Sequence, residues 1–315
     1  MRRGRGMGLV SWAATGMALM IMAGAGVWQW AVRTGSAAPL NWIDAAFPRD
    51  RRARLAATAG YGAHPAQRLE LWVPHGESGN RPLIVFYHGG GWHTGAPRDY
   101  RFVARTFAEH GFATALVGYR LVPDGRFPAM LQDSAAALAW LARNAAGHGV
   151  SGQKVILAGH SAGAYNAVML ALDPQWLRDA GVPDTMVAGA AGLAGPYDFY
   201  PFTTDSARAA LGHAEPPDRT QPIRFVRSDA PPLLLITGAD DDVVKPRNSA
   251  ALAAALQMAG GEAELVIIPA MGHAGIIMAL SKPFARDAAV ASQVADFART
   301  RLAQPTSGAV QDRLR

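Results

Sequence analysis

Cysteine is absent from this 315-residue chain, and lysine is nearly absent. Without cysteine, the chain has no disulfides, no catalytic thiol and no cysteine-based zinc site, so the fold depends on packing alone. Lysine occurs only at Lys154, Lys245 and Lys282, so the formal charge of +6 is mostly arginine. We interpret this bias as genome composition rather than as a surface for binding nucleic acid. With 50% hydrophobic and 17% charged residues, the composition is that of a globular chain long enough for one domain.

The chain also has few dense runs of basic residues and few patterns typical of metal ligands. The one dense basic run, Arg49 to Arg54, lacks the interleaved aromatics of a nucleic-acid platform. We expect it to face solvent or lipid headgroups, and we expect no nucleic-acid partner. The nine histidines are scattered, with no His-x-x-x-His pair and no carboxylate cluster at ligand spacing. The sequence therefore predicts neither a metal site nor a cofactor.

The N-terminus carries an uncharged stretch from Met7 to Val32, preceded by Arg2, Arg3 and Arg5. About 20 apolar residues suffice to span a bilayer, so the length favours a membrane helix. The preceding arginines favour an N-terminus inside the cell and hence a folded domain in the periplasm of a bacterial-type cell. The alternative is a signal segment cleaved near Ala23-Gly24-Ala25, which would give a secreted or periplasmic protein. We expect an anchor or signal at 1–33, a linker at 34–60, a single folded domain at 61–302 and a disordered tail at 303–315.

The body of the chain alternates strand and helix patterns, which is typical of a mostly parallel sheet covered by helices on both faces. The expected strands are Arg68–Val73, Leu83–Tyr87, Ala113–Val117, Lys154–Ala158, Val187–Leu193, Leu233–Thr237 and Glu264–Ile268. The expected helices are Tyr100–His110, Pro128–Asn144, Ala162–Leu172, Asn248–Ala259 and Asp287–Arg301. Residues 200–229, between two late strands, are rich in Pro, Asp and Arg and predict a small cap.

The most informative motif is Gly159-His160-Ser161-Ala162-Gly163, which follows an apolar strand and opens an alanine-rich helix. A strand that turns sharply into a helix at a serine holds that residue on a strained turn and exposes its oxygen. Ser161 is therefore the candidate nucleophile.

A second motif, His88-Gly89-Gly90-Gly91-Trp92, follows the expected strand Leu83–Tyr87. Acyl transfer through a serine creates an oxyanion that needs fixed N–H donors, and glycines let the backbone approach a substrate carbonyl closely. This motif and the serine motif stand in the order typical of lipases and esterases. The sequence thus pairs a candidate nucleophile with a candidate oxyanion loop.

The acid and the histidine of a triad follow the nucleophile in the expected order. Asp240, Asp241 and Asp242 come directly after the strand Leu233–Thr237, and His273 follows the strand Glu264–Ile268. Carboxylates at the C-terminal ends of parallel strands lie where an open α/β sheet presents its chemistry. We expect Ser161 and His273 to act together with one of the three aspartates.

These motifs, with Tyr119-Arg120 and Asp133, resemble the esterase branch of the α/β-hydrolase superfamily, including hormone-sensitive-lipase-like esterases, feruloyl-esterase-like carboxylesterases and arylformamidases. The resemblance covers about Tyr61 to Arg301. It implies the α/β-hydrolase fold, a triad of Ser161, Asp241 and His273 with Asp240 and Asp242 as the alternative acids, and an oxyanion hole made by the N–H groups of Gly90, Gly91 and Ala162.

The resemblance leaves the substrate open. It implies cleavage of carboxylic esters through an acyl-enzyme, while an arylformamidase-like amide hydrolase is the alternative within the same chemistry. An alternative of another class is a non-catalytic, membrane-tethered binding module on the same fold. An apolar acyl pocket could be built from aromatic side chains near the two motifs, namely Trp92, Tyr197, Phe199, Tyr200 and Phe202.

Overall fold

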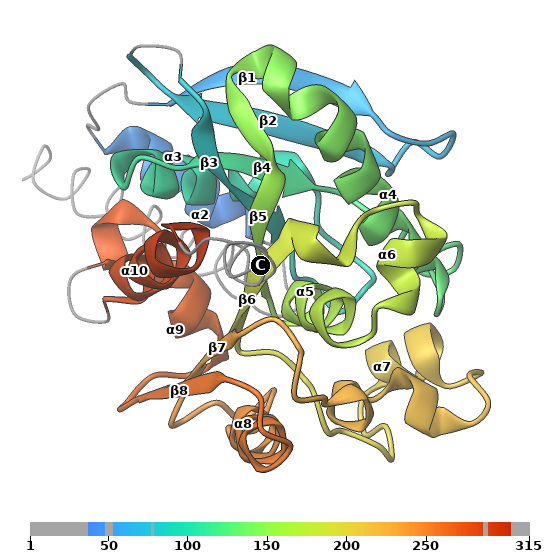
Figure 1. Cartoon of the computed structure of the whole chain (residues 1–315). Coiled ribbons are helices and arrows are strands. Elements are labelled where there is room, and N and C mark those ends of the chain that lie inside the picture. Colours follow the sequence, from blue (N-terminus) through green and yellow to red (C-terminus); the bar gives the residue numbers. More distant parts are fainter. Residues whose placement is uncertain (1–36, 48–52, 77–78, 286–288, 304–315) are drawn as a thin grey trace, which may run out of the picture.

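A mostly parallel sheet forms the centre of the protein in the computed structural model, which describes residues 37–47, 53–76, 79–285 and 289–303. Within these residues, eight strands follow the order β1-β2-β4-β3-β5-β6-β7-β8 (Figure 1). β2 runs antiparallel to β1 and β4, and the other neighbours are parallel. The strands are β1 Ala53–Gly60, β2 Arg68–Pro74, β3 Arg81–Tyr87, β4 Ala113–Val117, β5 Val150–His160, β6 Val187–Leu193, β7 Leu233–Gly238 and β8 Ala263–Ile268.

Helices cover both faces of this sheet (Figure 1). One face carries α4 (Ala129–Asn144), α5 (Ala162–Leu172) and α8 (Arg247–Met258). The other carries α3 (Arg101–Glu109), α9 (His273–Met278) and α10 (Val290–Ala303), and α2 (Ala38–Ala46) packs against α3 on that side. The short helix α6 (Gln175–Asp179) packs against α4. The expected fold class, an α/β-hydrolase fold with a mostly parallel sheet, is confirmed.

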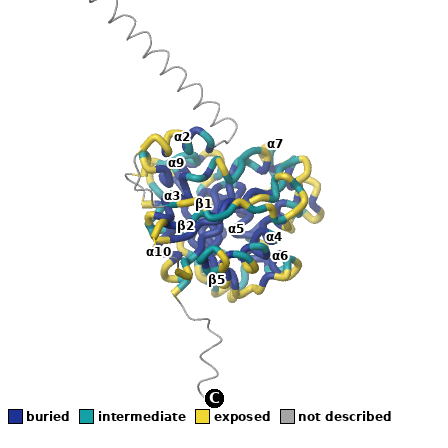
Figure 2. The backbone as a smooth tube through the Cα atoms, turned by 90° about the horizontal axis from the view of Figure 1, so that it is seen from above, coloured by how far each residue is buried: buried dark blue, intermediate teal, exposed yellow. Residues whose placement is uncertain are grey.

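The strand sequences explain why both faces are covered. In β3, Leu83, Val85 and Tyr87 point into the core under α4 and α5, while Ile84 and Phe86 point into the core under α3. Successive side chains of a strand alternate between faces, so an uninterrupted apolar run must be buried on both sides. Figure 2 shows the buried backbone concentrated in the centre and exposure confined to the outer loops and helix surfaces.

Residues 34–60 are expected to form a linker, but most of the residues described there belong to a helix and a strand. Residues Ala38–Ala46 form α2, and Ala53–Gly60 form the edge strand β1. β1 pairs antiparallel with β2, so the backbone groups on that side of the strand are hydrogen-bonded within the sheet. The basic run ends on this strand, where Arg54 is exposed.

The segment between β6 and β7, where a small cap was expected, contains the helix α7 (Asp205–Leu211) and two 3₁₀ turns, Pro217–Thr220 and Pro222–Phe225. Most other boundaries lie within two residues of those expected. The largest differences are that β5 begins at Val150 rather than Lys154, and that α10 spans Val290–Ala303 rather than Asp287–Arg301.

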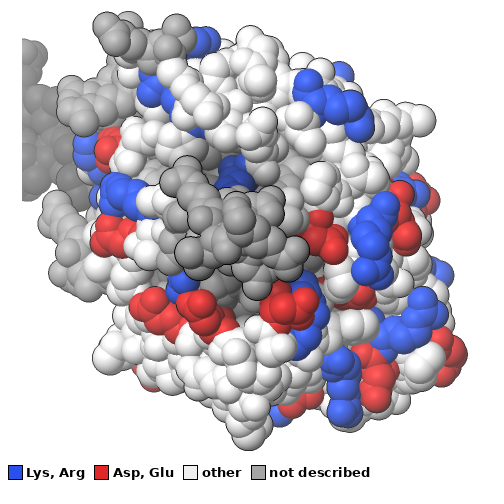
Figure 3. Space-filling view, viewed as in Figure 1, with Lys and Arg blue, Asp and Glu red and all other residues white. Residues whose placement is uncertain are grey.

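The expected N-terminal anchor or signal, and the tail beyond Ala303, lie outside the described residues. Among the residues that are described, no helix combines the length and apolarity needed to cross a bilayer. On the face drawn in Figure 3, basic and acidic side chains stand interspersed.

Candidate active site

The expected site residues meet at one edge of the sheet. Ser161 follows β5, Asp241 follows β7, His273 follows β8, and the loop containing Gly90 follows β3. Because β3, β5, β6, β7 and β8 run parallel, their carboxyl ends lie at the same edge. Residues separated by more than 180 positions are thereby brought together.

Ser161 occupies a strained turn between β5 and α5. Its backbone has φ 55° and ψ −119°, a conformation that costs a non-glycine residue about 1–3 kcal/mol. The turn is possible because α5 begins against β3: a Cβ on Gly163 would overlap the carbonyl oxygen of Tyr87. The sharp strand-to-helix turn expected from the sequence is therefore present, and the serine stands at its tip.

A continuous hydrogen-bonded relay connects Ser161, His273 and Asp241. His273 Nε2 lies 3.0 Å from Ser161 Oγ, and His273 Nδ1 lies 2.8 Å from Asp241 Oδ2. A carboxylate only accepts hydrogen bonds, so Nδ1 carries the proton and Nε2 is left to accept the hydrogen bond that the Ser161 hydroxyl donates. The imidazole is thus held in the tautomer that can take a proton from serine.

Asp241 is the aspartate that the structure selects from the three in the loop. Its carboxylate is buried and also accepts hydrogen bonds from the backbone N–H groups of Val243 (3.0 Å) and Val244 (2.8 Å). Asp240 and Asp242 are exposed. The loop thus places one carboxylate behind His273 and leaves its two neighbours exposed.

Two further histidines lie near the relay and are held neutral. Burial lowers the pKa of His88 to about 4, and its Nδ1 lies 2.8 Å from the carbonyl oxygen of Gly89. Burial, with a smaller contribution from neighbouring His273, holds the pKa of His160 well below its usual range. The Nε2–H of His160 donates to the His273 carbonyl oxygen at 3.3 Å. Both rings are placed to orient loops rather than to exchange protons with Ser161.

The glycine loop after β3 is shaped for close approach to Ser161. Gly90 and Gly91 have φ of 110° and 59°, and a Cβ on Gly90 would overlap the carbonyl oxygen of Thr94. The Gly90 carbonyl oxygen accepts hydrogen bonds within the loop from the backbone N–H groups of His93 and Thr94. Gly90, Gly91 and Ala162, the first residue of α5, all line the same cavity as Ser161.

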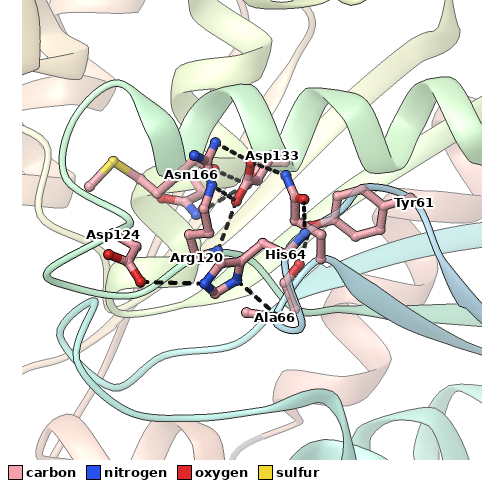
Figure 4. A network of polar contacts seen from close by, with 11 residues as sticks. Tyr61, His64, Ala66, Arg120, Asp124, Asp133 and Asn166 are labelled. Atoms are coloured by element: carbon pink, nitrogen blue, oxygen red, sulfur yellow. Dashed lines mark hydrogen bonds and ion pairs between the residues drawn. The ribbon is translucent and has the colours of Figure 1, made fainter.

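A network of hydrogen bonds, which the sequence motifs did not predict, holds the glycine loop in place. The Tyr119 hydroxyl donates to the His88 carbonyl oxygen at 2.7 Å, and the two rings stack with centroids 4.5 Å apart. The next residue, Arg120, donates its backbone N–H, Nε and Nη2 to buried Asp133, which also accepts from Gln67 Nε2 (Figure 4). Tyr119 and Arg120 thus connect the candidate oxyanion loop to α4.

Trp92, at the end of the glycine loop, anchors it on the other side. Its indole N–H donates to Asn166 Oδ1 at 3.3 Å, and its ring packs edge-on against Tyr165. The second stacking partner is Phe199, at 6.5 Å between centroids. Of the aromatics expected to build a pocket, Trp92 and Phe199 line the cavity, whereas Tyr197 is buried in the core and Tyr200 is half exposed.

A cavity of about 810 Å³ opens beside Ser161. Its wall is mostly apolar, with contributions from the glycine loop, the segment before α7, the acid loop and α9. Sequence reasoning missed one contributor, the N-terminal helix: Ala37, Pro39 and Leu40 also line the cavity. In the described parts of the chain, no group of three or more His, Asp or Glu side chains is arranged to hold a metal ion.

Comparisons with known proteins identify the family of the chain. The sequence profile of the BD-FAE family matches residues 69–256. A probable isoprenylcysteine alpha-carbonyl methylesterase of Oryza sativa subsp. japonica is 26% identical over 241 residues, covering 69% of this chain and 56% of that protein. Carboxylesterase NlhH of Mycobacterium tuberculosis is 37% identical over 127 residues, 40% of this chain and 39% of that protein. The chain thus spans little more than half the length of the first of these relatives.

Solved structures of esterases share the fold. A thermostable esterase from Pseudomonas putida superposes with a TM-score of 0.67 at 22% identity, covering 85% of this chain and 89% of that one. A truncated carbohydrate esterase from gut microbiota gives a TM-score of 0.67 at 19% identity, covering 82% and 99%. With the family profile matched over more than half of its length, the chain belongs to the BD-FAE family, in the esterase branch of the α/β-hydrolase superfamily.

Proposed function

We propose that this protein is a carboxylic ester hydrolase that works through a Ser161–His273–Asp241 triad and an acyl-enzyme intermediate. The observation that carries the proposal is the unbroken relay from Asp241 through His273 to Ser161, on the wall of an apolar cavity. A serine hydroxyl is a weak nucleophile until a base takes its proton, and here the base is already hydrogen-bonded to it.

The chemistry follows from the two ends of the imidazole. As Ser161 Oγ attacks the ester carbonyl carbon, its proton passes to His273 Nε2, and the imidazolium is stabilised by Asp241. Collapse of the tetrahedral intermediate breaks the bond to the alcohol oxygen, which takes the proton from Nε2. Water then attacks the acyl-enzyme by the same route, releasing the acid and restoring Ser161.

The negative charge of the tetrahedral intermediate requires fixed donors. The backbone N–H groups of Gly90, Gly91 and Ala162 are the proposed oxyanion hole, since all three residues line the cavity beside Ser161. Loss of one such donor typically costs about a hundred- to a thousandfold in kcat. Tyr119 and Trp92 contribute by holding the loop rather than by contacting the substrate carbonyl.

The conformation of Ser161 favours an enzyme over a passive binding module, and the relatives favour esters as its substrates. The strained backbone of Ser161 lowers stability, and a module that only binds ligands gains nothing from it. The curated relatives described above are named as esterases, which favours esters over amides as the substrate class. The apolar wall of the cavity suits an ester that carries an apolar group.

We further propose that residues 1–33 anchor the enzyme in a membrane. Support comes from the sequence alone: Met7 to Val32 is uncharged and preceded by three arginines. The arginines favour a cytoplasmic N-terminus and hence a catalytic domain on the other side.

The decisive experiment replaces Ser161. Ser161→Ala should abolish hydrolysis of p-nitrophenyl butyrate and covalent labelling by a fluorophosphonate, with an unchanged circular dichroism spectrum. Ser206→Ala is the matched control, because this serine lines the same cavity but its hydroxyl is paired with Thr204 instead of a histidine. Undiminished hydrolysis by well-folded Ser161→Ala would refute the proposed function.

A further inference from the structure

The N-terminal helix α2 buries its one carboxylate and exposes large apolar side chains. Its exposed residues are Trp42, Ile43, Ala45 and Ala46, and Phe47 follows at its C-terminal end; all five are uncharged, and we call them the outer face of α2. Trp42 is 63% exposed, Ile43 37% and Phe47 44%. The carboxylate of this helix, Asp44, is fully buried on the opposite side. A helix on a water-facing surface normally shows the reverse.

The buried side of α2 shows why the helix is held in this orientation. The Asp44 carboxylate accepts hydrogen bonds from Arg105 Nε at 2.8 Å and from the backbone N–H of Lys282 at 2.9 Å. Arg105 Nη2 also donates to Asn41 Oδ1 at 2.9 Å. Helix α2 is therefore fastened to α3 and to the turn after α9, and its aromatic side chains cannot rotate inward without breaking a buried ion pair.

The same helix forms part of the catalytic cavity. Leu40 lies one turn before Asp44, and it lines the cavity with Ala37 and Pro39. In Figure 2, α2 and α9 lie side by side at one end of the molecule, with α7 across from them. The outer face of α2 is thus rigidly related to the cavity that contains Ser161.

The surrounding sequence indicates what covers the outer face. The uncharged stretch Met7 to Val32 precedes α2 by a few residues, and the basic run Arg49 to Arg54 begins within three residues of its end. Apolar and aromatic residues next to arginines are typical of segments that lie in the headgroup layer, with arginines attracted to anionic lipids.

We propose that the outer face of α2 docks on the lipid bilayer and thereby presents the catalytic cavity to amphiphilic esters whose apolar chains lie in that bilayer. This inference deepens the proposed function and rests on it for the substrate class, whereas the docking itself does not depend on it. The ester carbonyl reaches Ser161 while the apolar chain follows the wall formed by α2 and α9.

The absence of cysteine makes the docking directly measurable. The full chain carrying Trp42→Cys is labelled with an environment-sensitive fluorophore and reconstituted into phosphatidylethanolamine–phosphatidylglycerol vesicles. We expect a blue shift on reconstitution and quenching by lipids with doxyl groups on their acyl chains. Met258→Cys is the matched control, because Met258 is 83% exposed and lies on α8, on the other face of the sheet. Its label should remain in water.

A kinetic experiment tests the substrate class separately. Trp42→Asp combined with Phe47→Asp should lower the rate on p-nitrophenyl decanoate embedded in the vesicles by about tenfold or more, since it removes the apolar area that would be buried in lipid. The rate on water-soluble p-nitrophenyl acetate should stay unchanged, as should both rates of Met258→Asp.

The outcomes separate the two proposals. The docking would be overturned if the Trp42→Cys label stayed in water after reconstitution. It would also be overturned if the blue shift occurred without vesicles, because a second copy of the chain or residues 1–36 would then cover α2. Docking with equal rates of wild type and double variant on the embedded ester would overturn the substrate class. Failure of the wild type to cleave either ester or to react at Ser161 would instead overturn the proposed function.

Discussion

At the scale of single residues, burial separates Asp241 from its two neighbours. Only Asp241 combines a buried carboxylate, two backbone N–H donors and the contact with His273 Nδ1. Asp241→Asn should lower kcat by about 10⁴, because an amide holds the imidazole in the wrong tautomer. Asp240→Asn and Asp242→Asn serve as matched controls, and each should retain most of kcat. Asp242 lines the cavity, so its variant is free to alter KM.

Steady-state kinetics on a soluble ester measure this difference. A crippling loss in Asp242→Asn, with Asp241→Asn nearly intact, would show that the relay in solution uses the neighbouring carboxylate.

His88 makes a residue-scale prediction about pH. Burial lowers its pKa from 6.5 to about 4, so the unfolded chain binds a proton in this window and the folded chain does not. The contribution of His88 to the free energy of unfolding is therefore fully present above pH 6.5. It is lost as the pH falls from 6.5 towards 4, and the total loss is about 3 kcal/mol. In His88→Asn, Tm at pH 7.5 should be lower, but its decline between pH 6.5 and 4 should be shallower than in the wild type. Identical slopes in the two proteins would contradict this assignment.

At the scale of elements, the ion pair of Arg120 and Asp133 fixes the loop after β4 to α4 (Figure 4). Asp133→Asn should lower the free energy of unfolding by about 3 kcal/mol, because it leaves a guanidinium without its buried counter-charge. Asp205→Asn is the control: the Arg208–Asp205 pair has the same N–O separation of 2.7 Å but is exposed, and its loss should leave Tm unchanged.

Urea denaturation with an unchanged m-value measures the effect, and kcat tests whether the network positions the oxyanion loop through Tyr119. Equal stability of Asp133→Asn and wild type would show that this network does not hold β4 and α4 together.

Two elements near the N-terminus differ from the sequence-based expectation for identifiable reasons. β1 is an alanine-rich edge strand whose residues are mostly exposed or half buried, so it lacks the alternating or fully apolar pattern of the other strands. Helix α2 has nine residues, too few for a clear period; Pro39 and Leu40 are buried, but Trp42 and Ile43 are exposed. Neither segment shows a helix or strand period that separates a buried face from an exposed one, which is why the sequence predicts a linker there.

At the scale of the whole molecule, the proposed anchor predicts the behaviour of the enzyme in cells. The chain should remain in the membrane fraction after a high-salt wash and be released by detergent, because Met7 to Val32 is long enough to span a bilayer while electrostatic attachment through Arg49 to Arg54 is screened by salt. A variant lacking residues 1–33 is the matched control.

Protease added to intact spheroplasts should digest the catalytic domain, because the N-terminal arginines favour its export. A soluble product beginning near Gly26 would demonstrate signal cleavage instead, and a protease-resistant domain would reverse the proposed orientation.

The sequence by itself determined the alternation of strands and helices, the strained turn at Ser161, the glycine loop after β3 and the positions of the acid loop and His273. These are local features, because periodicity, glycine and strand ends act over a few neighbouring residues. Only the tertiary structure decided which of Asp240, Asp241 and Asp242 faces His273, since that depends on how the loop after β7 packs against the loop after β8. The place of α2 on the cavity wall was decided in the same way, because Arg105 and Lys282, 61 and 238 residues away from Asp44, hold it there.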